Sequence, residues 1–211
     1  AAATAAAVAG AATAIGALTT KAIEGYAAQE QLVGGVETLF KTSSNTVVGY
    51  ANDAYKTAGM SANEYMETVT SFSASLLASM NNDTAAAAEK ANVAITDMSD
   101  NANKMGTDIS LIQNAYNGFA KQNYTMLDNL KLGYGGTKEE MQRLLDDASK
   151  LSGIKYDISS YSDVVDAIHV VQTEMGITGT TAKEASTTIE GSVSSMSSAW
   201  DNWVAGMADS E

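Results

Sequence analysis

Residues Ser61–Met105, SANEYMETVTSFSASLLASMNNDTAAAAEKANVAITDMSDNANKM, predict two helices joined by a tight turn. The first four residues form a capping-box pattern, in which the Ser61 hydroxyl accepts from a free helix amide and Glu64 reaches back to the chain before the helix. Apolar residues then recur at spacings of 4, 3, 4 and 4, which places them on one helix face: Tyr65, Val69, Phe72, Leu76 and Met80.

The second helix of this stretch carries a short heptad-like row. Asn81–Thr84 is typical of a turn and a helix cap, and Gly106 ends the pattern. Between them, small and apolar residues recur at spacings of 3, 4, 3, 4 and 3: Ala88, Ala91, Ile95, Met98, Ala102 and Met105. We expect this row to pack against a neighbouring helix or a partner.

Capping boxes and apolar helix stripes recur along the chain. Two more capping boxes are predicted, Thr137 with Glu140 and Thr181 with Glu184, and Gly34-Gly35 permits a helix break. The last helix is expected to place Trp200, Val204 and Met207 on one stripe that packs on the core or on a partner helix. Two-residue alternation is not sustained anywhere, so we expect an all-α bundle of about seven to nine helices joined by Gly-rich turns. An extended Ala-rich helix is expected over 1–30, with a helical core domain over 31–211.

Composition excludes several classes of function. The chain has 211 residues, with 12 Lys plus Arg against 25 Asp plus Glu, a formal charge of −13. This balance argues against general nucleic-acid binding and against docking on an anionic membrane. With no cysteine, disulfides, thiolate catalysis and cysteine metal sites are excluded. With no proline, nothing interrupts long helices from within.

The glycine-rich stretch Leu130–Leu145, LKLGYGGTKEEMQRLL, invites comparison with phosphate-binding loops. A phosphate loop needs Gly-Lys-Ser/Thr after its first glycine, whereas Gly136 is followed by Thr137, and Lys138 stands where a dinucleotide fingerprint needs its last glycine. No strand is expected before it. The stretch is therefore interpreted as a turn followed by a capped helix.

The other residues that could form a catalytic or metal-binding site give only weak signals. His169 is the only histidine and lies beside an apolar stripe, so we expect it at the edge of the core. Asn101–Ile112 fails as a calcium loop because Ile112 occupies the place of the bidentate glutamate. The pairs Glu139-Glu140 and Asp146-Asp147 fall on the polar face of one helix. We expect no catalytic residue, no metal, no cofactor and no enzyme activity.

Two segments leave alternatives open. Residues 1–20 carry no charge, and they suit either a close-packing helix or a helix that contacts a membrane. Trp200 and Trp203 suit either helix packing or an interfacial anchor.

Long phrases of the sequence resemble tail tape-measure proteins of long-tailed phages and prophages of Gram-positive bacteria. They are GMSANEYMETVTSFSASLLASM, ITDMSDNANKMGTDISLIQNAYNGFAKQNYTMLDNLKLGYGGTKEEMQRLL, YDISSYSDVVDAIHVVQTEMGITGTTAKEASTTIEGSVSSM and SAWDNWVAGMAD. The stretch AQEQLVGGVETLF, at 28–40, differs slightly from the sequence that is usual in the family. Together the phrases cover nearly the whole chain from about residue 26.

The resemblance implies a virion structural protein of the phage tail that sets tail length during assembly in the host cytoplasm and leaves the tube at DNA ejection. Its implied partners are the tail tube protein, tail assembly chaperones and other copies of itself, and the family offers no active-site motif to carry over. The capping boxes and Gly-rich turns instead favour a compact bundle. A membrane-active helical segment aiding genome delivery and a signalling or adhesion stalk remain as alternative functions.

Overall fold

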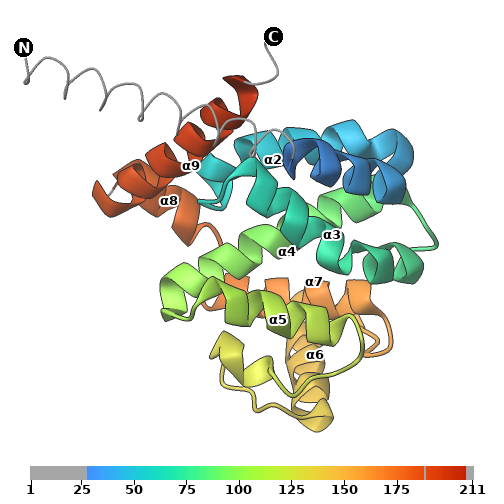
Figure 1. The fold of residues 1–211 in the computed structure, drawn as a ribbon. Coiled ribbons are helices and arrows are strands. Elements are labelled where there is room, and N and C mark those ends of the chain that lie inside the picture. The colour runs from blue at the N-terminus through green and yellow to red at the C-terminus, as the bar shows by residue number, and fades with distance from the viewer. Residues whose placement is uncertain (1–27, 188, 208–211) are drawn as a thin grey trace, which may run out of the picture.

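The computed structural model describes residues 28–187 and 189–207, and the expected features of residues 1–27 lie outside this range. Within the described residues the chain is all-α, without strands, which confirms the predicted bundle (Figure 1). A helix over 28–40 comes first. It is followed by η1 (Lys41–Ser43), α2 (Ser44–Thr57), α3 (Ala62–Ser79), α4 (Thr84–Met105), α5 (Ile109–Phe119), η2 (Leu127–Leu130), α6 (Lys138–Ser152), α7 (Tyr161–Glu174), α8 (Thr180–Thr187) and α9 (Ile189–Met207).

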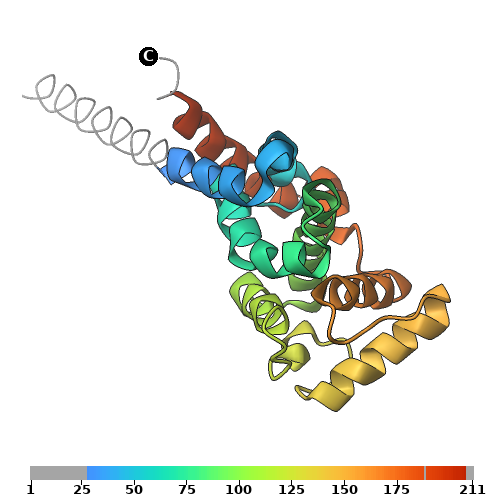
Figure 2. The same cartoon turned by 90° about the vertical axis from the view of Figure 1, so that its right-hand side faces the viewer.

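Helix α4 is the centre of the bundle. It packs against α2, α3, α5, α7 and α8, while α6 pairs with α7 and α8 pairs with α9. Figures 1 and 2 show α2 and α3 on one side of α4, with α5, α6 and α7 on the other. The predicted row on α4 explains this position: Ala88, Ala91, Ile95 and Met98 are buried, and Ala102 and Met105 pack partly buried against the core. Small side chains let several helices approach one axis closely.

Local signals set most helix ends. Ser61 accepts from the Glu64 amide at 3.4 Å, and Glu64 accepts from the Ser61 amide at 2.7 Å, so this capping box is present as predicted. Asp83 caps α4 through the amides of the second and third residues after it. Gly106 ends α4 in the left-handed conformation, at φ 63°, which glycine adopts without a steric penalty.

The break that Gly34-Gly35 permits does not occur, because the helix runs without interruption from 28 to 40. It also continues across the expected domain boundary at residue 30. Val36 and Phe40 are fully buried, and tertiary packing of this apolar face outweighs the low helix propensity of two glycines.

Gly34→Ala is expected to stabilise the protein by about 0.5–1 kcal/mol, because an alanine loses less backbone entropy in a helix. A Cβ added at Gly34 meets no atom within 4 Å. Urea unfolding at equilibrium measures the change, and a destabilised variant would contradict a helix through this residue.

The predicted capping box of Thr181 with Glu184 is also wrong. α8 begins at Thr180, and its free amides are satisfied from another helix: Asp100 of α4 accepts from Gly179 N at 2.6 Å and from Thr181 N at 2.8 Å. Within the described residues the buried Thr181 hydroxyl has no hydrogen-bond partner. A carboxylate from the core thus replaces the local cap.

Candidate interaction surfaces

The glycine-rich bend before α6 is closed by the chain's own side chains. Arg143 lies over the Tyr134 ring, 4.3 Å from its centroid, and donates to the Gly133 carbonyl at 2.8 Å. Thr137 caps α6 by accepting from Glu140 N at 3.2 Å. The Glu140 carboxylate turns to Gly135 N, at 3.0 Å, so only the threonine half of the predicted capping box forms.

Glu140 fills the place that an anion would take at this bend. The hydrogen bond from Arg143, and then that from the Gly135 amide, lower the pKa of Glu140 to about 2. A phosphate would have to displace a carboxylate that stays ionised at neutral pH. The geometry therefore agrees with interpreting Leu130–Leu145 as a turn and helix start.

His169 joins α7 to α4 at the rim of the core. Its Nδ1 lies 2.9 Å from Asp97 Oδ2, and Lys90 pairs with Asp166 between the same two helices. Asp97 is buried, whereas 37% of the His169 side chain is exposed. The hydrogen bond to Asp97 raises the pKa of His169. His169 therefore holds two helices together, and within the described chain no three His, Asp or Glu side chains gather as a metal site.

This pair predicts a small pH dependence of stability. Because its pKa is raised in the fold, protonated His169 contributes stability below the ordinary histidine pKa, and that contribution is lost as the pH rises through the folded pKa. The partial exposure of the ring keeps the effect small. The free energy of unfolding of the native chain should fall relative to His169→Gln as the pH rises above the ordinary histidine pKa. Parallel pH curves for the two proteins would contradict the pairing.

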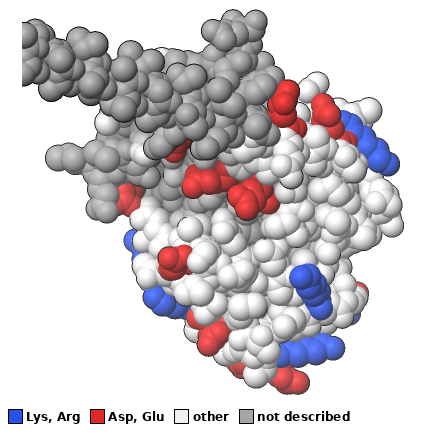
Figure 3. All heavy atoms as spheres, in the orientation of Figure 1, with Lys and Arg blue, Asp and Glu red and all other residues white. Residues whose placement is uncertain are grey.

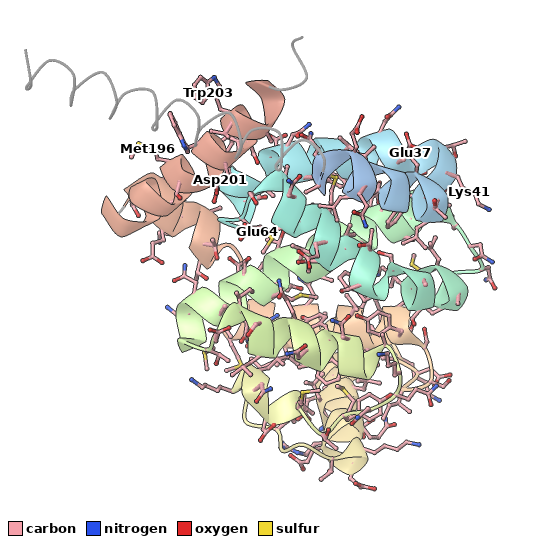
Figure 4. All side chains as sticks on the ribbon, viewed as in Figure 1. Glu37, Lys41, Glu64, Met196, Asp201 and Trp203 are labelled. Atoms are coloured by element: carbon pink, nitrogen blue, oxygen red, sulfur yellow. The ribbon has the colours of Figure 1, made fainter. Side chains whose placement is uncertain are left out.

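A polar groove of about 850 Å³ lies between α3, α4, α5 and α8. Its described lining residues include three carboxylates and no lysine or arginine: Glu64, Glu67 and Glu184. Figure 3 shows acidic side chains near the centre of this face, and Figure 4 places Glu64 there. Two hydrogen bonds cross from α3 to α5, Gln113 to Thr68 and Ser71 to Asn117, each at 3.0 Å. The described lining residues offer amides, hydroxyls and carboxylates.

The second surface is the outer face of α9. Three large apolar side chains lie exposed there, namely Met196 at 67%, Trp200 at 53% and Trp203 at 54%. The two tryptophan rings touch, with centroids 4.8 Å apart. In Figure 4, Met196 and Trp203 lie on the side of α9 that is turned away from α3. We call these three residues the α9 stripe.

The last helix is expected to place Trp200, Val204 and Met207 on one stripe that packs on the core or on a partner helix. Val204 packs on the core, at 7% exposed, whereas Trp200 is 53% exposed and its packing on a partner helix stays a prediction. The Met207 side chain lies outside the described residues. The inner face of α9 is set by smaller, polar residues. Ser198 donates to the Gly59 carbonyl at 3.3 Å, and Asn202 accepts from Ala62 N at 2.9 Å. These bonds satisfy backbone groups at the α2–α3 turn, and helical geometry then turns Trp200 to the opposite side.

Among the described helices, none combines the length and the apolar character needed to cross a bilayer. The expected membrane contact through residues 1–20 lies outside the described residues. The chain matches no protein-family model, no curated protein and no solved structure.

Proposed function

We propose that this chain is a helical segment of a phage tail tape-measure protein, acting in tail assembly and tail-length determination. The observation that carries the proposal is the run of long phrases resembling that family, from about residue 26 to residue 209. An all-α fold with an exposed aromatic stripe on its last helix supports an assembly role. The proposed partners are the tail tube protein, tail assembly chaperones and other copies of the chain, in the virion tail and in the host cytoplasm during assembly.

A tape-measure protein can contain this segment either as the compact bundle or as an extended helix. Residues 28–207 would span roughly 270 Å as one continuous helix, at about 1.5 Å per residue. The buried caps and the α4-centred core favour the bundle in isolation. In the tail, we propose, the segment contributes length in one of these two states.

In-frame deletion of residues 28–207 from the full tape-measure gene tests the proposal. Tails measured by electron microscopy should shorten, by roughly 270 Å if the segment is extended and by clearly less if it stays compact. As a control, an unrelated helical insert of equal length at the same position should restore the length in the extended case. Viable particles with tails of unchanged length would refute a ruler role for this segment.

A further inference from the structure

The α9 stripe leaves three adjoining large apolar side chains in water. Trp200 and Trp203 are also the chain's only tryptophans, so both lie in one exposed patch. Single exposed apolar residues need no explanation, but a contiguous apolar patch of a few hundred Å² is often a functional surface.

The order of residues along the stripe makes it complementary to itself. In an antiparallel pair of α9 helices with the two-fold axis near Ala199, Met196 of one copy falls opposite Trp203 of the other, because each lies about equally far from that axis. A methionine sulfur against an aromatic ring is a favourable contact. Trp200 lies beside the axis, so the Trp200 rings of the two copies would meet at the centre of the pair.

Charge also selects a second copy. Between Met196 and Gly206 the only charged residue is Asp201, in a chain of net charge −13. Two copies can therefore meet here without bringing many carboxylates together, whereas a basic or acidic partner would find little to recognise. We propose that the α9 stripe is the interface of an antiparallel, two-fold symmetric pair formed by two copies of this chain.

The size of the stripe sets the strength of the pair. Three half-exposed side chains supply roughly 300–400 Å² per copy, against about 800 Å² for a stable interface. The pair is therefore weak and forms when copies are concentrated, as in an assembly that holds several of them. Formation of the pair by the purified chain does not depend on the tail-length proposal.

Sedimentation of the full 211-residue chain tests the proposal, from about 5 to about 500 µM, the range suited to a small interface. We expect a concentration-dependent shift from monomer to dimer, with a parallel blue shift of tryptophan emission. Met196→Ser combined with Trp203→Ser should weaken pairing at least about tenfold, since it removes both ends of the stripe. Leu151→Ser combined with Ile154→Ser removes apolar side chains that are 50% and 59% exposed elsewhere, and should leave pairing unchanged.

Added salt and lipid vesicles distinguish a second copy of the chain from a charged partner or a lipid surface on the α9 stripe. Because the copies repel, added sodium chloride should strengthen an apolar pair, whereas it would weaken a charged contact. A monomer at every concentration, pairing that survives loss of the stripe, or pairing weakened by salt would each overturn the proposal. So would a blue shift with phosphatidylcholine vesicles at concentrations where the chain is monomeric, since a lipid surface would then be the occupant.

Discussion

Gly136→Ala is expected to destabilise the protein by about 2–4 kcal/mol, because the bend before α6 has no room for a side chain. An alanine Cβ at this position would lie 2.3 Å from the carbonyl oxygen of Thr125 and 3.0 Å from its carbonyl carbon. Both are backbone atoms, so no side-chain rotation relieves the contact, and the bend must move away from the segment before η2.

Gly135→Ala is the matched control for this prediction. Its Cβ would meet only the Glu140 side chain, at 3.5 Å, which is an ordinary van der Waals contact. We expect a cost below about 1 kcal/mol for the control. Equilibrium urea unfolding of both variants, compared at constant m-value, gives the difference. Equal stabilities for the two alanine variants would show that the bend does not press against Thr125.

The features that could be predicted from the sequence are those decided within a few residues. The Ser61 capping box, the Asp83 cap and the Gly106 stop depend on backbone groups at most four positions away, and each appears in the structure. The all-α fold class could also be predicted, because the spacing of apolar residues along the chain directly reflects the period of the α-helix. In the Gly-rich bend the sequence signals a turn, but the contact between Gly136 and Thr125 depends on chain folding.

The features that could not be predicted depend on distant partners. The cap of α8 comes from Asp100, 79 residues before Gly179 in the chain, while a plausible local threonine stands beside it unused. On α9, the apolar spacing placed Trp200 and Val204 on one stripe, but in the structure Val204 is buried and Trp200 is exposed. The side of α9 that faces the core is set by the hydrogen bonds that Ser198 and Asn202 make to the α2–α3 turn. The polar groove lies between four helices, and no local sequence pattern predicts it.

Asp100→Ala is expected to cost about 3–6 kcal/mol and to loosen α8. Asp100 is fully buried, and its carboxylate accepts from two backbone amides, Gly179 N and Thr181 N. Removing it leaves both amides at the helix start without their acceptor, and each charge-assisted bond contributes about 1.5–3 kcal/mol. Because α8 packs on both α4 and α9, the loss should reach beyond one turn.

Two other substitutions separate this long-range cap from local capping. Asp108→Ala removes an exposed cap, in which Asp108 accepts from Ser110 N at 2.8 Å, and should cost only about 1 kcal/mol. Thr181→Ala should be close to neutral, because the hydroxyl has no partner in the described part of the chain; a local capping box would instead make it cost about 1 kcal/mol. Urea unfolding gives the total costs, and hydrogen exchange of the α8 amides shows where the loss falls. If Asp100→Ala matched Asp108→Ala in cost and left α8 exchange unchanged, the start of α8 would not depend on the carboxylate from α4.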